Sequence, residues 1–311
     1  MKRLNSKGFE MSFTWIFAIV VGISIFIFTF ILVSKIMNTG NIASDAKVAK
    51  EISILFNPLE TGFEEGKTSS FTLASNSRII NNCNTNGNFG RQIISTSQFT
   101  LGKWSTANVE VGSLNKYIFS NDVTEGKKFY IFAKPFKFPF KVTDLIYITS
   151  ASDKYCFINS PENIENELSN LNQANIFVEN CSNDNDKILV CFSGSGCDIN
   201  VRYSNEAGSV LKNGETVYFE TDALMYAAIF SNSELYECQV KRLMKRLDLL
   251  SQIYIDKVGF SSDSCDSNLN PTLIQLQAYA SSAESSGELE QIKTLSKNID
   301  ELNDYARCSL W

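Results

Sequence analysis

The longest apolar stretch of the chain covers residues 13 to 33 and contains no charged side chain. An α-helix rises about 1.5 Å per residue, so this stretch is long enough to cross the hydrocarbon core of a bilayer, which is about 30 Å thick. The apolar core of a cleavable secretory signal is shorter, about 7–15 residues, and small residues follow it at the cut. The pattern therefore predicts a transmembrane helix that is retained as a signal anchor.

After this stretch, the pattern predicts one helix and then a series of short strands. Residues 42 to 56 read as helical, and Asn57 before Pro58 ends that helix. Short alternating or continuous apolar runs, typical of strands, lie at residues 70–73, 91–95, 109–111, 128–134, 144–149, 155–158, 176–178, 188–192, 217–219 and 225–230. Pro161 and Glu162 begin a helix between two of these strands, which predicts a βαβ-type unit.

From residue 231 onward, the apolar positions recur at helical spacing. Ser231 with Glu234 and Ser285 with Glu288 are candidate capping boxes, in which both side chains satisfy backbone N–H groups at a helix start. Asn270, directly before a proline, is a typical start for a helix between these two. Three helices joined by short loops are expected to pack antiparallel.

These elements predict an α+β chain with four parts. Residues 1–34 form a cytoplasmic leader and transmembrane anchor, and residues 35–60 form a membrane-proximal stalk helix. Residues 61–232 form a strand-rich, disulfide-bonded ectodomain that contains the βαβ-type unit. Residues 233–311 form the C-terminal three-helix antiparallel bundle.

The chain has eight cysteines and no histidine. The cysteines lie at positions 83, 156, 181, 191, 197, 238, 265 and 308, all beyond the apolar stretch. An even number on one side of a membrane span is typical of an oxidising compartment. A zinc site needs closer spacing, often with histidine, whereas the nearest pair here is Cys191 and Cys197. We expect disulfides, with no metal and no other cofactor.

The order of the C-terminal helices restricts the disulfide pairing. If the first helix descends, Cys238 lies at its top and Cys265 lies in the loop at its bottom. Cys308 ends the third helix beside Cys265, so Cys265–Cys308 is the expected pair. Cys238 must then reach a cysteine upstream, and several connectivities stay open for the others.

Charge predicts the orientation and the partners. Lys2, Arg3 and Lys7 precede the apolar stretch, whereas Lys35 alone follows it closely. Positive side chains favour the cytoplasmic side, so everything after Ser34 is expected outside the cytoplasm. A formal net charge of −6 argues against nucleic acid as a partner. The expected partners are the lipid bilayer and other surface proteins or copies of this chain.

Lys7-Gly8-Phe9, which runs into the apolar stretch, resembles the leader of type IV prepilins. In that family a dedicated peptidase cuts after the glycine, which implies a mature N-terminus at Phe9. The resemblance covers about the first sixth of the chain. Bacterial-type pilins carry a glutamate five residues after the cut, but that position is Phe13 and Glu10 stands second. The whole chain is also similar to one-span surface proteins of archaea.

Residues 134–141 form the most unusual local string, in which phenylalanine and lysine alternate around two prolines. Both prolines exclude a central strand. One interpretation is an aromatic and basic contact surface for a glycan, an anionic polymer or a neighbouring subunit; the other is a proline-protected edge strand. The residues concerned are Lys134, Phe136, Lys137, Phe138, Phe140 and Lys141.

Two loops also carry polar chemistry. Residues 191–197 lack the first glycine of a nucleophile elbow, and no histidine could activate Ser195, so a disulfide-closed turn is expected. Asp184 and Asp186 have calcium-like spacing without the glycine and glutamate of an EF-hand, which favours a solvated turn.

The first C-terminal helix carries four basic residues, Lys241, Arg242, Lys245 and Arg246. They could bind an anionic surface. We expect them instead to face solvent or the acidic side chains of the third helix, which are Glu288, Glu290, Asp300, Glu301 and Asp304.

The missing histidine excludes Ser-His-Asp triads, Cys-His pairs and imidazole acid–base chemistry. The sequence therefore favours a membrane-anchored, extracytoplasmic structural or interaction protein of the cell surface, and a pilin-like subunit is the sharper form of that hypothesis. The alternative is a surface-anchored hydrolase that uses two carboxylates, although no Asp/Glu pair stands out.

Overall fold

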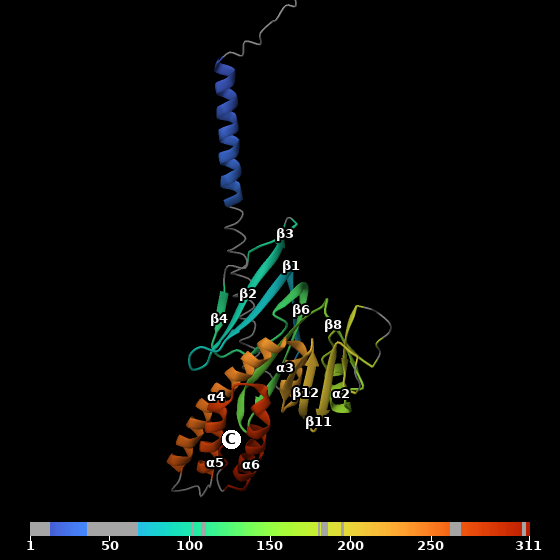
Figure 1. Ribbon diagram of the computed structural model, residues 1–311, viewed down its shortest axis with the longest axis vertical. Coiled ribbons are helices and arrows are strands. Elements are labelled where there is room, and N and C mark those ends of the chain that lie inside the picture. Colours follow the sequence, from blue (N-terminus) through green and yellow to red (C-terminus); the bar gives the residue numbers. More distant parts are fainter. Residues whose placement is uncertain are drawn as a thin grey trace, which may run out of the picture.

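The structure is a computed structural model of the 311-residue chain. It describes residues 13–35, 68–100, 102–106, 110–179, 181, 186–193, 196–261, 269–306 and 309–311. Figure 1 shows one helix apart from a body of two sheets and several helices. The predicted stalk helix, apart from Lys35, lies outside the described residues.

The anchor helix, Phe13–Lys35, is long and apolar enough to cross a membrane. All of its side chains are exposed, including Phe13, Trp15 and Phe26. Its hydroxyls bond within the helix, because Ser24 Oγ donates to the Val20 carbonyl and Thr29 Oγ1 to the Ile25 carbonyl, both at 2.8 Å. A helix that satisfies its own polar groups and exposes apolar side chains all round suits a lipid environment.

The first sheet has seven strands in the order β3-β2-β1-β6-β7-β5, and β4 also pairs with β2. Its pairs are antiparallel except for β5 and β7. A register shift between Thr72 and Ser77 interrupts the pairing of β1 with β6. The strands are β1 (Thr68–Asn84), β2 (Arg91–Thr100), β3 (Lys103–Trp104), β4 (Glu110–Ser113), β5 (Ile118–Phe119), β6 (Val123–Lys137) and β7 (Lys141–Ser150).

The second sheet has six strands in the order β13-β12-β11-β10-β8-β9. Strands β9, β8, β10 and β11 run parallel, whereas β11, β12 and β13 form antiparallel pairs. Helix α2 (Glu162–Asn170) lies between the parallel neighbours β8 and β9 in the sequence. The strands are β8 (Lys154–Ile158), β9 (Ile176–Val178), β10 (Lys187–Cys191), β11 (Ile199–Ser204), β12 (Ala207–Lys212) and β13 (Glu215–Phe219).

Helix α3 (Asp222–Phe230) replaces the strand predicted at residues 225–230. Thr221 begins it by accepting a hydrogen bond from the Leu224 N–H at 3.2 Å. Every side chain from Ala223 to Phe230 is buried. The prediction was wrong because a helix buried on all sides has no polar face, so a short apolar run does not distinguish it from a strand.

The remaining helices are α4 (Ser233–Ser261), α5 (Leu269–Ser282), the 3₁₀ turn η1 (Ser286–Glu288) and α6 (Leu289–Tyr305). The capping box of Ser285 and Glu288 is confirmed. The box predicted at Ser231 is wrong, since Ser231 ends α3 and the Asn232 side chain accepts from the Leu235 N–H at the start of α4.

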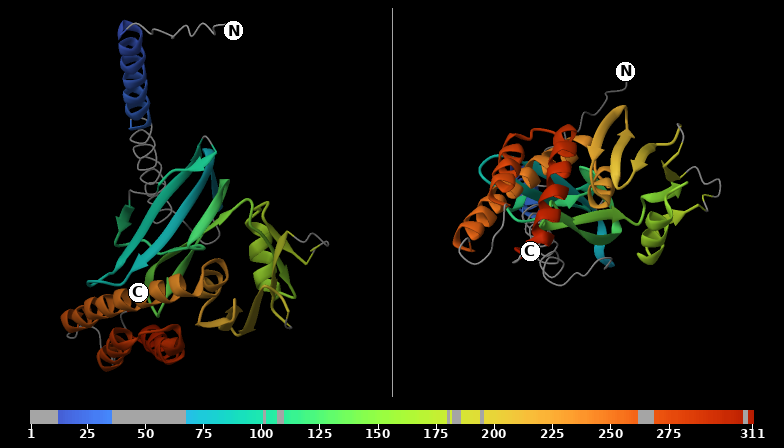
Figure 2. Two further views of the ribbon diagram at one scale, coloured as in Figure 1. Left: turned by 45° about the horizontal axis from the view of Figure 1, so that its top comes forward. Right: turned by 90° about the horizontal axis from the view of Figure 1, so that it is seen from below.

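One apolar cluster extends through both sheets and the helices. Phe230 lies within it, with ring centres 5.7 Å from Phe132 and 5.0 Å from Tyr155. Leu243 of α4 and Ile299 of α6 belong to the same cluster. Figure 2 shows α4 lying across the first sheet, with α5 and α6 on its far side. The C-terminal helices therefore share the core of the strands.

Candidate functional site

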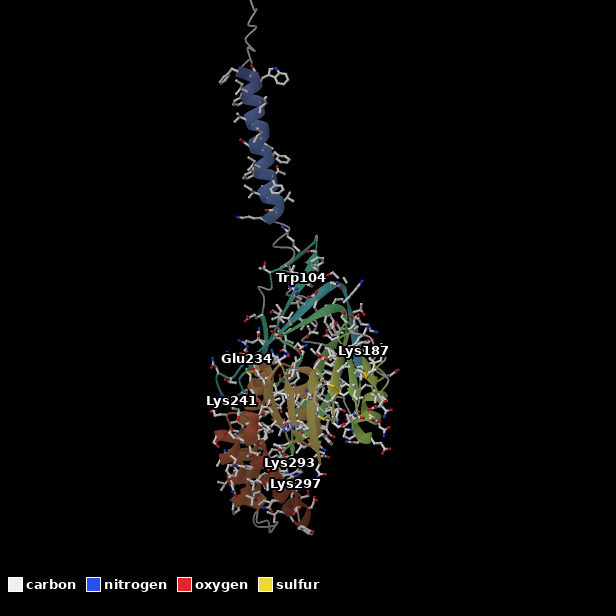
Figure 3. All side chains as sticks on the ribbon, turned by 45° about the vertical axis from the view of Figure 1, so that its right-hand side comes forward. Trp104, Lys187, Glu234, Lys241, Lys293 and Lys297 are labelled. Atoms are coloured by element: carbon white, nitrogen blue, oxygen red, sulfur yellow. A yellow bond between two sulfur atoms is a disulfide. The ribbon has the colours of Figure 1, made fainter. Side chains whose placement is uncertain are left out.

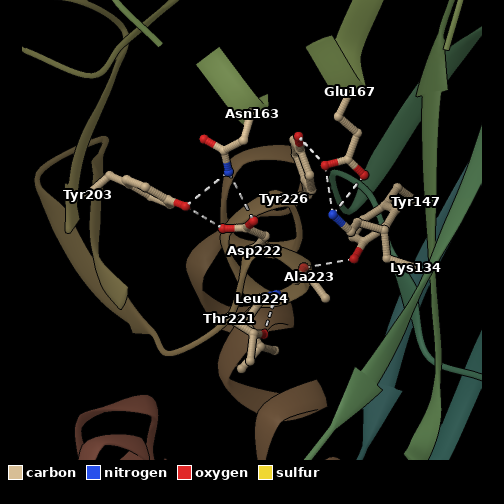
Figure 4. Close-up of polar contacts among 10 residues, drawn as sticks. All are labelled: Lys134, Tyr147, Asn163, Glu167, Tyr203, Thr221, Asp222, Ala223, Leu224 and Tyr226. Atoms are coloured by element: carbon tan, nitrogen blue, oxygen red, sulfur yellow. Dashed lines mark hydrogen bonds and ion pairs between the residues drawn. The ribbon is translucent and has the colours of Figure 1, made fainter. Parts of the chain in front are cut away.

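A cluster of charged and phenolic side chains lies where α2 and α3 meet the first sheet (Figure 4). Lys134 extends from β6, and its Nζ lies 2.7 Å from the carboxylate of Glu167 on α2. The Tyr226 hydroxyl on α3 donates to Glu167 Oε2 at 3.0 Å. Glu167 therefore has a cation and a phenol as partners.

The second half of this cluster joins α2 and α3 to the second sheet. The Tyr203 hydroxyl on β11 donates to Asp222 Oδ1 at 2.8 Å. Asn163 Nδ2 lies 3.5 Å from Asp222 Oδ2 and 3.4 Å from the Tyr203 hydroxyl. Tyr147 on β7 donates to the Ala223 carbonyl at 2.7 Å.

The phenols of this cluster stay protonated at neutral pH. Burial raises the pKa of Tyr226 and Tyr147 well above 10, and the neighbouring Glu167 carboxylate acts in the same direction. Burial raises the pKa of Tyr203 to about 12. Each phenol is therefore a hydrogen-bond donor rather than a base. The cluster joins the two sheets and α2 to α3, and it holds no activated nucleophile.

The aromatic side chains of the predicted contact surface at residues 134–141 are buried. Phe136, Phe138 and Phe140 are at most 1% exposed, and the Phe140 ring centre lies 4.2 Å from that of Tyr254 on α4. The contact-surface interpretation was wrong because the string ends the β6–β7 hairpin, which α4 and the C-terminal residues cover. The segment from residue 134 to 137 pairs only with β7 among the described residues, as in an edge strand.

The three lysines of that string have separate roles. Lys134 binds Glu167, and Lys141 Nζ lies 2.8 Å from Asp144. Lys137 is exposed. No common basic face remains once the aromatic side chains are buried.

The basic side chains of α4 were also placed wrongly by the sequence. Of the four, only Lys241 forms an ion pair with a described acid, Glu284, and Figure 3 places Lys241 at the edge of the molecule. Arg242 is fully buried and donates to the carbonyls of Phe89, Lys116 and Leu114 at 3.1, 2.9 and 3.0 Å.

The surroundings of Arg242 explain its charge state. Its guanidinium also binds Gln239 Oε1 at 2.6 Å and lies 4.5 Å from the ring centre of Tyr117. Desolvation lowers the pKa of Arg242 to about 10, which still leaves it charged at neutral pH. Gly90 makes room for it, since a Cβ there would lie 2.7 Å from Arg242 Cγ.

Neighbouring groups extend this attachment, which we call the α4 lock. Lys245 Nζ donates to the Thr85 and Gly87 carbonyls at 2.6 and 2.9 Å, and Arg246 Nε donates to the Val142 carbonyl at 2.8 Å. The lock consists of Gln239, Arg242, Lys245, Arg246 and the disulfide Cys83–Cys238. The sequence does not reveal the α4 lock, because its acceptors are backbone carbonyls, which every residue carries.

Three disulfides join described residues. They are Cys83–Cys238, Cys156–Cys181 and Cys191–Cys197. Cys265 and Cys308 lie outside the described residues, as do Gly8, Phe9 and Asp184. Within the described part of the chain, no group of three or more Cys, Asp or Glu side chains could hold a metal ion.

Three open cavities border the described residues. The first, about 270 Å³, is lined by Lys141, Asp144 and Arg246 among others, and Asp144 already pairs with Lys141. The second, about 540 Å³, lies between α5 and α6 and contains Glu290. The third, about 400 Å³, lies against β11 to β13 and contains no carboxylate. None of the three brings two carboxylates together.

The strongest features of the described chain are thus an apolar helix without protein cover and a disulfide-bonded body held together by buried polar contacts. No group of three or more Cys, Asp or Glu side chains marks a metal centre among the described residues. Comparison with family models, with curated proteins and with solved structures gives no significant match to this chain.

Proposed function

We propose that the protein is a membrane-anchored, extracytoplasmic module of the cell surface that acts through structure or binding. The observation that carries this proposal is the anchor helix. The side chains of Phe13–Lys35 are exposed and predominantly apolar, and only lipid or another apolar partner could cover them. One span fixes the protein to a membrane and leaves the described chain from Thr68 onward on one side of it.

The disulfides support the extracytoplasmic side. Bonds such as Cys83–Cys238 and Cys156–Cys181 persist in oxidising compartments and are rare in the reducing cytosol. Lys2, Arg3 and Lys7 before the helix favour the same orientation. The hydrolase alternative receives no support from the three cavities, which never contain more than one carboxylate.

A pilin-like subunit is the sharper form of this proposal. It rests on Lys7-Gly8-Phe9 before the apolar helix, and it requires removal of residues 1–8. Intact mass of membrane-extracted protein should then give Phe9 as the first residue. Gly8→Leu should block the cut, and Ser6→Ala should leave it unchanged. Retention of Met1 in the unaltered chain would exclude the pilin-like form and leave a plain signal anchor.

Protease digestion of intact cells tests the location itself. With an epitope tag at the C-terminus, protease added outside should remove the tag and leave a shorter fragment associated with membranes. Carbonate washing should not release the protein. Protection of the C-terminal tag in intact cells, with cleavage only after lysis, would contradict the proposal.

A further inference from the structure

Strand β7 is irregular at Val142, close to its start. Register pairs the residues on either side with β6 but leaves Val142 itself without a partner there. An extra residue of this kind bends its strand, and such bulges often re-aim side chains beside functional sites. The Val142 carbonyl accepts a hydrogen bond from Arg246 Nε on α4 at 2.8 Å. The irregular start of β7 and the middle of α4 are therefore joined at this point.

A cavity of about 270 Å³ lies beside the irregularity. It is lined by Asn115, Lys141, Val142, Thr143, Asp144 and Arg246. These residues come from the connection between β4 and β5, from the start of β7 and from α4. The volume is just below that of most small-molecule sites, about 300–1,000 Å³, so it suits one compact group of a ligand.

The lining carries more positive than negative charge. Its cations are Lys141 and Arg246, and its carboxylate is Asp144, which lies 2.8 Å from Lys141 Nζ. No carboxylate of a described residue lies within ion-pair distance of Arg246. The neighbouring Tyr117 does not supply an anion either, because burial raises the pKa of its phenol above 10. One positive charge at the cavity is therefore not neutralised by a described group.

The accessible polar groups of the cavity are mainly hydrogen-bond donors. The Lys141 side chain is 50% exposed, and Asp144 occupies one of the three donors of its ammonium group. Asn115 is exposed, and its Oδ1 accepts from Ser113 Oγ at 3.0 Å, which leaves its amide N–H groups as donors. Ammonium, guanidinium and amide donors around an excess positive charge match a ligand that is anionic and only accepts hydrogen bonds.

Both cations are held in place by the protein itself. Arg246 is half-buried and fixed through Nε by the Val142 carbonyl. Lys141 is fixed by Asp144, whose side chain is 7% exposed and belongs to the buried part of β7. Groups that are fixed before the ligand arrives lose less entropy on binding.

We propose that this cavity binds a tetrahedral oxyanion, namely a phosphate or sulfate group that is free or carried as an ester. The Arg246 guanidinium and the Lys141 ammonium bind separate oxygens of the anion, and the Asn115 amide donates to another. A carboxylate has only two oxygens and satisfies fewer of these donors. The proposal gives a ligand class to the binding role proposed above, and it rests on that role only for the biological source of the anion.

Titration calorimetry on the full chain tests this assignment in an uncharged maltoside detergent, which contributes no phosphate group. The probes are inorganic phosphate, sulfate and acetate at equal ionic strength. We expect phosphate and sulfate to bind at least about tenfold more tightly than acetate. A fourth probe, glycerol 3-phosphate, distinguishes the sources: affinity equal to that of phosphate indicates an esterified group, and weaker binding indicates the free anion. Equal affinity for acetate and sulfate would overturn the assignment.

Four variants locate the site. Lys141→Met and Arg246→Lys should each weaken sulfate binding, the first by about tenfold, because they remove a cation and the planar fork respectively. Asp144→Asn should tighten sulfate binding, since it removes the negative charge of the lining. Lys137→Met changes an exposed lysine of the same hairpin outside the cavity lining, and this matched control should leave binding unchanged. Damage to the fold cannot produce the tighter binding expected of Asp144→Asn.

The failing outcomes are distinct from those of the proposed function. Sulfate binding that Lys141→Met and Asp144→Asn leave unchanged would place the anion elsewhere and overturn this site. Dissociation constants above about 10 mM for both phosphate and sulfate would mean only general attraction to a positive charge, and the site would fall. Neither result bears on the protease digestion, which tests the membrane location alone.

Discussion

The two sheets are fastened to their helices in different ways. The first sheet meets α4 through the α4 lock, whose contacts join residues 104 to 160 positions apart. The second sheet meets α3 through an apolar interface that contains Val210, Phe219 and Phe230. Its disulfides close short loops, with separations of 25 and 6 residues.

The two attachments differ because the helices meet different kinds of surface. Helix α3 follows β13 almost directly and has apolar side chains on every side, so hydrophobic burial holds it in place together with hydrogen bonds from Tyr147 and Tyr203. Helix α4 crosses the end of the β1–β2 hairpin, where the available groups are backbone carbonyls. At this place the buried Arg242 guanidinium and the disulfide Cys83–Cys238 hold the helix instead of an apolar interface.

Removing the disulfide Cys83–Cys238 should cause the largest loss in the free energy of unfolding. Chain-entropy reasoning assigns about 5 kcal/mol of stability to a bond that spans 155 residues, and about 2 kcal/mol to one that spans 6. Cys83→Ser with Cys238→Ser should therefore lower the free energy of unfolding by about 5 kcal/mol in urea titrations. The control is Cys191→Ser with Cys197→Ser. Equal losses for the two pairs would remove the distinction between the sheets.

Arg242→Met should cause the next largest loss in the free energy of unfolding. It leaves the carbonyls of Phe89, Lys116 and Leu114 buried without their donor, which costs about 4 kcal/mol in similar cases. Lys241→Met is the matched control on the same helix, because its ion pair with Glu284 is 29% and 68% exposed at its two ends. A loss of less than about 1 kcal/mol is expected for the control. Similar losses in thermal unfolding for both variants would contradict the α4 lock.

Alkaline pH should lower the free energy of unfolding in part through the α3 interface. An unfolded tyrosine loses its proton near pH 10, whereas burial holds the pKa of Tyr147 and Tyr226 well above 10 in the folded chain. Above pH 10 the folded state therefore binds more protons, and stability falls as pH rises, by about 1.4 kcal/mol per pH unit for each such tyrosine.

Tyr226→Phe isolates this contribution. Urea titrations between pH 10 and 12 should show a slope shallower by about 1.4 kcal/mol per pH unit. Tyr305→Phe, at a side chain that is 89% exposed, controls for the loss of one phenol from the chain. An unchanged slope in Tyr226→Phe would show that this phenol titrates alike in both states.

The smallest expected effect concerns α6, which belongs to neither sheet. Ser285→Ala removes half of its capping box and should cost about 1 kcal/mol. Ser281→Ala, at an exposed serine within α5, is the control. Thermal unfolding that is unchanged in Ser285→Ala would mean that packing alone defines the start of α6.

The sequence predicted features that depend on local pattern. The anchor helix follows from one apolar run, and the Ser285–Glu288 box follows from two residues at fixed spacing. Prediction from the sequence failed where tertiary contacts determine the local structure or the partners of a side chain. Burial on all sides hid the helical character of residues 225–230, and the partners of Arg242 could not be foreseen because carbonyl oxygens leave no mark in the sequence.

The prediction that the phenylalanines of residues 134–141 form a contact surface was wrong for a related reason. Alternation correctly suggests that Phe136, Phe138 and Phe140 share an environment, and all three are buried. It does not say whether protein or solvent lies over them. Phe140 is covered by Tyr254 and Trp311, which follow more than a hundred residues later in the chain.

The long disulfide also determines the order of events during synthesis. Because 155 residues separate its partners, Cys83 is made roughly ten to thirty seconds before Cys238, at ordinary rates of translation. Cys156, Cys181, Cys191 and Cys197 arrive in the interval, and each can capture the waiting thiol. Exchange must then release Cys83 again before α4 can dock. A cell that lacks a disulfide isomerase where this chain folds should accumulate it as mispaired, protease-sensitive chains, however well the finished fold is stabilised.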